Sequence, residues 1–186
     1  MIVIAPAEPG HAEGIAALAE EMDRFYGASE VEPFDLRVRQ INEALFTSPP
    51  SAFVLLAWDD SELVGFAAYS FVWPAVGLTR SLYLKELYVA EKARRSGVGK
   101  LLMHNLYKIA VERRCSRVEW TADRSNPGAQ QFYSGLGVPM VESKLFYRLD
   151  GRALLQHLKD RGCICQLACA SSRIGARELL ATRHVG

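Results

Sequence analysis

The sequence predicts an α/β protein with a mixed, largely antiparallel central sheet and helices on both faces. The first observation is the order of the expected elements, which is β-α-α-β-β-β-α-β-α-β and differs from that of a doubly wound fold. The second is the run of residues 82–89, which is apolar or aromatic at almost every position, as in a strand covered on both faces. The third is composition, because 186 residues that are 49% hydrophobic and 23% charged suffice for one full core.

The N-terminal part is predicted to form a strand and two helices. Residues 2–5 read as the strand, and residues 6–10 as a turn into the first helix, which Gly27 ends. Asp35 is the expected N-cap of the second helix. Apolar residues at helical spacing define the inner faces of the two helices: Ile15, Leu18, Ala19, Met22, Phe25 and Tyr26, then Val38, Ile41 and Leu45.

A hairpin comes next. Residues 53–58 and 63–72 are its expected strands, with a turn at residues 59–61, and Gly65 marks a bulge or a close backbone contact. A loop over residues 73–80 leads to the central strand, 82–89. From Val98 the period of the apolar residues changes to that of a helix, so a long helix begins at the glycines Gly97 and Gly99.

The remaining elements are shorter. We expect a strand at residues 117–121, a short helix at 126–136, a last strand at 144–149 and a closing helix after Gly151. Residues 1–160 are therefore predicted to form one domain. Residues 161–186 continue no pattern, so this tail is either disordered or a dimerisation arm.

Charge and hydropathy exclude several classes of protein. The formal net charge is +1, and no long run of one sign indicates a nucleic-acid or membrane partner. The longest apolar run, residues 52–58, is too short to cross a bilayer, and the N-terminus lacks the basic region of a leader, so we expect a cytoplasmic protein. Three of the four cysteines, Cys163, Cys165 and Cys169, gather in the tail without a fourth metal ligand, so no metal site is expected.

The strand-to-helix turn at residues 94–100, here called the glycine loop, predicts an anion site. Glycines let a ligand approach the backbone, and the first turn of a helix offers N–H groups without internal partners. Arg94, Arg95 and Lys100 add positive charge, which favours a di- or polyphosphate. A Walker loop is excluded because Arg94 and Leu101 stand at its required positions, and a dinucleotide loop because Leu102 replaces its third glycine.

A second motif runs from Asn126 to Gly137. Pro127 follows Asn126 as a helix start, and three residues share the face that turns toward the sheet: Ala129, Phe132 and Tyr133. Taken by itself, this motif is also explained by an Asn cap and two aromatic core residues.

Together, the two motifs and their separation make residues 2–159 resemble the GNAT N-acetyltransferase superfamily. The resemblance implies a GNAT-type fold, acetyl-CoA as co-substrate without a metal, and a homodimer. It implies that the glycine loop, through Arg94, Arg95, Gly97, Val98, Gly99 and Lys100, holds the pyrophosphate. It further implies that the backbone of Leu87, Tyr88 and Val89 pairs with the pantetheine, that Asn126, Ala129 and Phe132 lie along the cofactor, and that Tyr133 lies beside its sulfur.

The sequence is most similar to the spermidine/spermine and thialysine branch of that family. Three segments carry this similarity: residues 82–89, residues 113–116 and Phe132-Tyr133. Where the polyamine enzymes have two adjacent acids, however, this chain has Lys85 followed by Glu86. The resemblance places the acceptor beside the first two helices, whose acids either attract a cationic acceptor or form a solvated face: Glu20, Glu21, Asp23, Glu30 and Glu32.

Chemistry assigns two catalytic candidates. An alkylammonium has a pKa near ~10.4, so a base must take its proton before attack on the thioester, and Glu86 is the best candidate. On a regular strand Glu86 would share a face with Leu84 and Tyr88, opposite Lys85, and a bulge at this point would alter that. The N–H near Leu87 would stabilise the oxyanion, and Tyr133 would protonate the departing thiolate.

The function predicted from the sequence is acetyl transfer to a primary amine of a small cationic metabolite, amino-acid-like or polyamine-like. Two alternatives stay open. One is an aminoglycoside or protein amine as acceptor, and the other is a non-catalytic acyl-CoA-binding module.

Overall fold

The computed structural model describes residues 1–160, which fall into two units, Met1–Val138 and the part of Pro139–Gly186 that reaches residue 160. The predicted tail and its cysteines lie outside the described residues. The predicted domain boundary at residue 160 therefore stays a prediction.

The first unit is built on a five-stranded sheet in the order β1-β2-β3-β4-β5. Its strands are β1 (Ile2–Pro6), β2 (Phe53–Asp59), β3 (Glu62–Val72), β4 (Arg80–Val89) and β5 (Cys115–Glu119). All neighbours are antiparallel except β4 and β5, which are parallel. The predicted mixed, largely antiparallel sheet is thus confirmed, with β5 two residues earlier than expected.

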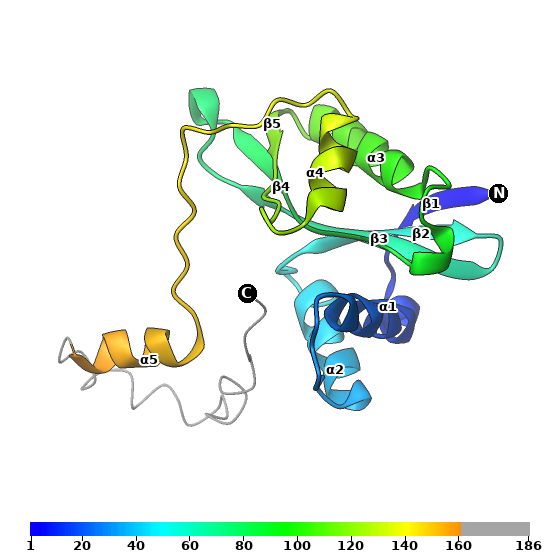
Figure 1. Ribbon diagram of the computed structural model, residues 1–186, viewed down its shortest axis with the longest axis horizontal. Helices are drawn as coiled ribbons and strands as arrows, with labels where there is room; N and C mark the ends of the chain where they lie inside the picture. Colours follow the sequence, from blue (N-terminus) through cyan, green and yellow to red (C-terminus); the bar gives the residue numbers. More distant parts are fainter. Residues whose placement is uncertain (161–186) are drawn as a thin grey trace. The chain divides into compact units, whose positions relative to one another are not determined.

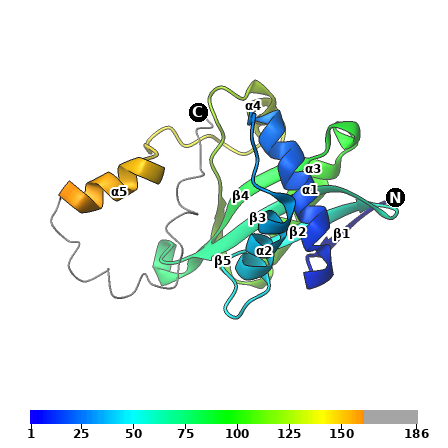
Figure 2. The same ribbon diagram turned by 90° about the horizontal axis from the view of Figure 1, so that it is seen from below.

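Helices cover both faces of this sheet, as Figure 1 shows. The helices α1 (Ala12–Phe25) and α2 (Phe34–Leu45) lie on one face, and Figure 2 shows them crossing the strands. The helices α3 (Val98–Glu112) and α4 (Pro127–Ser134) lie on the other. Each face has its own core, with Ile15, Leu18 and Tyr88 on the α1 side. On the α3 side the core includes Leu82, Leu84, Leu102 and Leu106.

Two β-bulges interrupt the sheet. Between β2 and β3, Ala57 pairs with Gly65 and Trp58 with Leu63, so one residue of β3 is extra. A Cβ at Gly65 would also lie 2.8 Å from the carbonyl oxygen of Tyr88. Gly65 therefore marks both a bulge and a close backbone contact, the two alternatives that the sequence left open.

The second bulge lies in β4 and changes which side chains share a face. Ala68 pairs with Glu86 and Tyr69 with Leu84, which leaves Lys85 unpaired. Leu84 therefore faces the α3 core, whereas Tyr88 faces the α1 core. Of the two alternatives that the sequence left open, a regular strand and a bulge, the structure shows the bulge. Leu84 therefore does not share a face with Glu86 and Tyr88, because an extra residue reverses the alternation.

Two further predictions about elements are corrected. Asp35 does not cap α2, because the helix begins at Phe34 and the N-cap is Pro33, without a side-chain cap bond. Residues 144–149 form no strand in the described part of the chain, where α5 (Gly151–Asp160) is the only regular element of the second unit. Local β-propensity makes no strand without a partner edge.

No helix within residues 1–160 is long and apolar enough to cross a membrane.

Candidate functional site

The glycine loop has the geometry of an anion site. Gly97 is the N-cap of α3 with φ of +90°, a conformation that other residues rarely adopt, and a Cβ added there would meet no atom within 4 Å. The amide of Leu101 bonds to the carbonyl of Gly97 at 3.1 Å, which starts the helix. The amides of Val98, Gly99 and Lys100 precede Leu101 in the first turn of α3, and N–H groups in this turn have no acceptors within the helix.

Gly99 is needed for packing as well as for access to the backbone. A Cβ at this position would lie 3.1 Å from the ring of Phe132. Any larger residue would therefore require the ring of Phe132 to shift by a few tenths of an ångström. Phe132 also packs against the α3 core.

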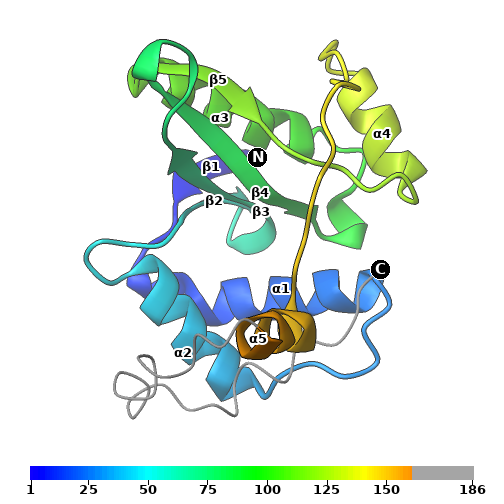
Figure 3. The same ribbon diagram turned by 90° about the vertical axis from the view of Figure 1, so that its left-hand side faces the viewer.

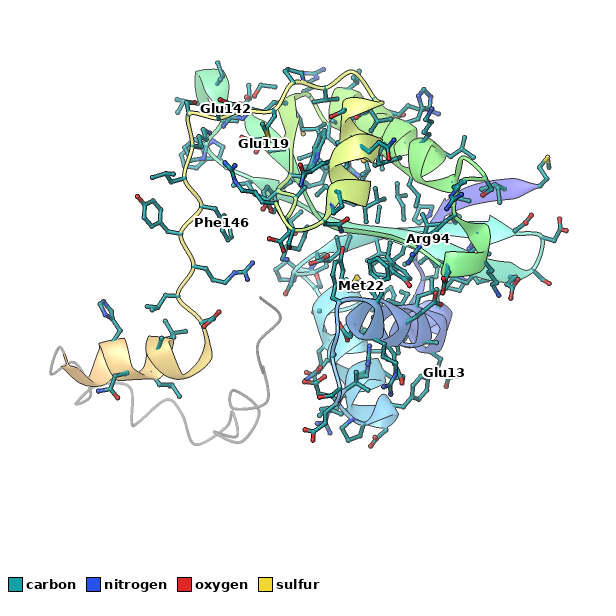
Figure 4. The ribbon with its side chains drawn as sticks, viewed as in Figure 1. Glu13, Met22, Arg94, Glu119, Glu142 and Phe146 are labelled. Atoms are coloured by element: carbon teal, nitrogen blue, oxygen red, sulfur yellow. The ribbon has the colours of Figure 1, made fainter. Side chains whose placement is uncertain are left out.

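Arg94, one of the predicted pyrophosphate-binding residues, has partners within the chain. Its Nε donates to the Val89 carbonyl at 3.1 Å, and Nη2 lies 3.4 Å from the Tyr88 hydroxyl. The guanidinium carbon also lies 4.2 Å from the centre of the Phe25 ring, so Arg94 ties the loop to α1 (Figure 4). Arg95 and Lys100 are the exposed cations of the glycine loop, whereas Arg94 is half-buried. The roles of all three at a pyrophosphate stay predictions.

The second half of β4 has an open edge. β5 pairs with β4 only from Arg80 to Tyr83, and within residues 1–160 no strand pairs with that side of residues 84–89. Figure 3 shows the two strands separating toward α4. The backbone of Leu87 to Val89, predicted to meet a ligand, lies in this half of β4. The open edge leads to the glycine loop, which follows it directly in the chain.

Glu86 lies on the α1 side of the sheet, next to Tyr88 in the alternation. The Lys85 side chain reaches Glu86, and Lys85 Nζ donates to Glu86 Oε1 at 2.7 Å. This contact forms at the bulge, where the regular alternation of the strand is interrupted. The Glu86 side chain is 35% exposed, so solvent and small ligands reach it. The most exposed member of the pair is Lys85, at 65%.

Tyr133 lies in an aromatic cluster and keeps its proton. Its ring packs on Trp120 and Phe132, with centroid distances of 5.1 Å in both cases. Burial raises the pKa of Tyr133 to about 12, and the neighbouring Tyr26, Glu86 and Tyr107 act in the same direction. At neutral pH Tyr133 therefore keeps its proton and serves as a hydrogen-bond donor.

Asn126 caps α4. Its Oδ1 accepts from the Ala129 amide at 3.0 Å, as expected of a cap. The Asn126 side chain also bonds to Tyr26, lowering the Tyr26 pKa, although burial and the charge of Glu86 raise that pKa overall. Asn126, Tyr26, Glu86 and Tyr133 therefore surround one region.

The sequence analysis missed several residues of this region. Tyr26 was assigned to the apolar face of α1, yet it is 42% exposed and reaches Asn126. Glu21 accepts from the Tyr88 hydroxyl at 2.9 Å and from the Glu91 amide at 3.0 Å. This acid therefore has a structural role, and its two bonds join α1 to the end of β4.

Arg37, which the sequence analysis did not name, forms an ion pair with Asp23 that joins α2 to α1. Arg37 Nη2 donates to Asp23 Oδ2 at 3.2 Å. The sequence does hold a signal for Arg37, which stands one turn before Ile41 on the otherwise apolar face of α2. Within residues 1–160 no group of three or more His, Cys, Asp or Glu is placed to hold a metal ion.

Relatives of the chain agree on one family of enzymes. The chain is 31% identical over 96 residues to L-ornithine N5-acetyltransferase NATA1 of Arabidopsis thaliana, and the match covers 52% of this chain and 42% of that protein. It is 33% identical over 98 residues to D-amino-acid N-acetyltransferase HPA3 of Saccharomyces cerevisiae, covering 52% and 60%. A thialysine N-epsilon-acetyltransferase of Bos taurus is 24% identical over 162 residues, covering 82% and 95%. The predicted similarity to the thialysine branch is thereby confirmed, at low identity.

Solved structures and a family model agree with these relatives. An integron cassette protein from the mobile metagenome of V. cholerae matches with a TM-score of 0.79 and 28% identity, covering 85% of this chain and 98% of that one. The model of the acetyltransferase (GNAT) family matches residues 15–138, which is more than half of the chain. The chain therefore belongs to the GNAT acetyltransferase family.

Proposed function

We propose that the protein is an acetyl-CoA-dependent N-acetyltransferase that acts on a primary amine of a small cationic metabolite. The observation that carries the proposal is the open edge of β4, which includes Glu86 and leads directly to the glycine loop, together with a protonated Tyr133 on which the charge of Glu86 acts. A proton donor, a carboxylate and an anion site are the groups that acyl transfer from a thioester to an amine requires.

The residues present fit coenzyme A. The amides of Val98, Gly99 and Lys100 with the nearby charges of Arg95 and Lys100 suit a pyrophosphate. The open edge of β4 offers backbone groups from Leu87 to Val89 to the amides of a pantetheine, although the Val89 carbonyl already accepts from Arg94. Bound acetyl-CoA supplies the thioester, and the chemistry that remains is positioning and proton handling.

Glu86 takes the proton of the attacking ammonium, directly or through a water molecule. The N–H near Leu87 stabilises the negative charge that develops on the carbonyl oxygen. Tyr133 donates a hydrogen bond to the departing sulfur. Its raised pKa keeps this donor protonated over the whole physiological range.

The names of the relatives support an amino-acid-like acceptor, since three of them are named for ornithine, D-amino acids and thialysine. The chain matches only 42% and 60% of the length of the first two relatives. The identity of the acceptor is therefore a proposal that experiment must test. A homodimer and a cytoplasmic location remain predictions.

The test is to incubate the protein with acetyl-CoA and a panel of amines and to follow free thiol and acetylated product. We expect amine-dependent thiol release with amino acids that carry a side-chain amine. The panel includes polyamines, aminoglycosides and lysine peptides. Release only with the last two would move the acceptor to another class, and binding of acetyl-CoA without transfer to any amine would leave a non-catalytic module.

A further inference from the structure

The bulge in β4 brings together two side chains that a regular strand would separate. Successive side chains of a strand point to opposite faces, and the bulge interrupts this alternation at Lys85. Lys85 Nζ donates to Glu86 Oε1 at 2.7 Å, and the two side chains are 65% and 35% exposed. An ion pair this exposed adds little to the stability of a fold, so stability alone does not explain the pair.

The Lys85–Glu86 pair lies in the half of β4 that has an open edge. β5 pairs with β4 only at residues 80–83, so within residues 1–160 no strand covers that side of residues 84–89. The same edge leads to the glycine loop. Lys85 thus presents a primary amine, the group that the protein is proposed to acetylate, at the edge proposed for the cofactor. The distance of 2.7 Å also lies within the reach of a general base.

We propose, resting on the acetyl transfer proposed above, that the protein acetylates its own Lys85. Lys85 Nζ gives one proton to Glu86 and then forms a bond to the acetyl carbon of acetyl-CoA, while the bond from that carbon to sulfur breaks. Nζ loses a second proton as the amide forms. One of the two protons ends on the departing sulfur, and the other reaches solvent through Glu86. The step therefore needs no reactant other than acetyl-CoA.

Acetylation of Lys85 changes the charge beside Glu86. The acetylated side chain is a neutral amide, so the ion pair is lost and the Glu86 carboxylate is left to a cationic ligand. The positive charge that disfavours a second ammonium at this edge is lost as well. The modified protein therefore uses polyamines better, relative to amino acids, than the unmodified protein does. Acetyl-CoA in this way sets the acceptor preference of the enzyme that uses it.

The experiment incubates the full chain with acetyl-CoA in a buffer without amines and quantifies acetylated lysines by mass spectrometry of peptides. Lys92 is the internal control for chemical acetylation, because it is 60% exposed and also pairs with a glutamate, Glu62. We expect acetylation of Lys85 to be at least about 10²-fold faster than that of Lys92, since a positioned general base contributes such a factor. The rate should not change when the protein is diluted, because amine and base belong to one chain.

Two variants complete the test. Glu86→Gln removes the base, so acetylation of Lys85 should fall to the rate of Lys92 in the same sample, with calorimetry of acetyl-CoA binding as the control for folding. Preincubation with acetyl-CoA should raise kcat/KM for putrescine relative to L-ornithine about 2- to 5-fold in the unaltered protein. Lys85→Arg keeps the charge without an amine that can be acetylated, so its ratio should stay constant.

Several outcomes would overturn the assignment. They are equal acetylation of Lys85 and Lys92, a rate at Lys85 that Glu86→Gln leaves unchanged, and a rate that rises with protein concentration, which would mean transfer between copies. A ratio that acetylation of Lys85 leaves unchanged overturns its effect on the acceptor. Transfer to free amines without acetylation of Lys85 overturns this inference alone, whereas absence of transfer to Lys85 and to every free amine contradicts the proposed function itself.

Discussion

Replacement of Tyr133 by phenylalanine tests the role of its hydroxyl. The substitution keeps the ring that packs on Trp120 and Phe132 and removes only the proton donor. The pKa of about 12 makes Tyr133 a weaker acid than a thiol, whose pKa is ~8.5, so complete proton transfer to the thiolate would cost about 5 kcal/mol. The structure therefore favours a hydrogen bond to the developing thiolate over full protonation.

The magnitude follows from the strength of such a bond. A hydrogen bond to a charged group is worth about 1.5–3 kcal/mol, which corresponds to about 10- to 150-fold in rate. We expect turnover in Tyr133→Phe to fall by about 10²-fold, with the affinity for acetyl-CoA nearly unchanged.

The assay is thiol release at saturating acetyl-CoA and amine, with calorimetry for cofactor affinity. Tyr69→Phe is the matched control, because Tyr69 is a buried tyrosine of the same core, 8% exposed, that packs on Phe53 and Phe71. Turnover in Tyr133→Phe equal to that of the control would refute the reasoning and assign Tyr133 to packing alone.

Three further predictions follow from the structure. Gly97→Val should abolish measurable acetyl-CoA binding in calorimetry, because the added side chain obstructs the approach of the ligand to the backbone. Gly77→Val is the control and should bind acetyl-CoA normally, since it suffers the same left-handed strain at φ +67° with no atom near its Cβ. Undiminished binding in Gly97→Val would mean that the glycine loop is not the pyrophosphate site. Lys85→Glu should shift kcat/KM toward polyamines, since each interaction between unit charges at ~4–6 Å and an effective dielectric near 20 is worth about 3–4 kcal/mol before solvent screening. Lys92→Glu, a change at another exposed lysine, should cause no such shift. An unaltered protein that strongly prefers spermidine would show that Lys85 does not act on the acceptor. The pKa values of Tyr88 and Tyr133 are raised from 10.0 to about 12, so the folded state holds these protons more tightly than the unfolded state. The free energy of urea unfolding should therefore decline as the pH rises from 10 to 12, and it should decline less steeply in a Tyr88→Phe/Tyr133→Phe double variant. Equal slopes in the two proteins would contradict this linkage.

The sequence predicted the sheet and its helices because their signals are local. The change from strand to helical period at Val98 and the breaker Gly27 lie within a few residues of the boundaries that they set. The strand predicted for residues 144–149 failed because a strand depends on a partner edge, which no local pattern supplies.

The site was predicted less completely, for a similar reason. Glu86 and Tyr133 were identified from chemistry and motif, but the bulge at Lys85 depends on the register with β3 and changed the face that Glu86 occupies. Arg94 was assigned to the phosphate from its charge and its place in the glycine-loop motif. Its contacts with Val89 and Phe25 could not be predicted, because the fold brings these partners to it. Arg37 and Tyr26 were missed because their roles depend on α1 packing beside β4 and α4.

The most direct test of the central claim is a crystal structure of the protein with coenzyme A bound. The account predicts the pyrophosphate within hydrogen-bond distance of the amides of Val98, Gly99 and Lys100. It also predicts the pantetheine along the open edge of β4 and the sulfur beside the Tyr133 hydroxyl. Coenzyme A bound away from β4, or a sulfur remote from both Tyr133 and Glu86, would contradict it.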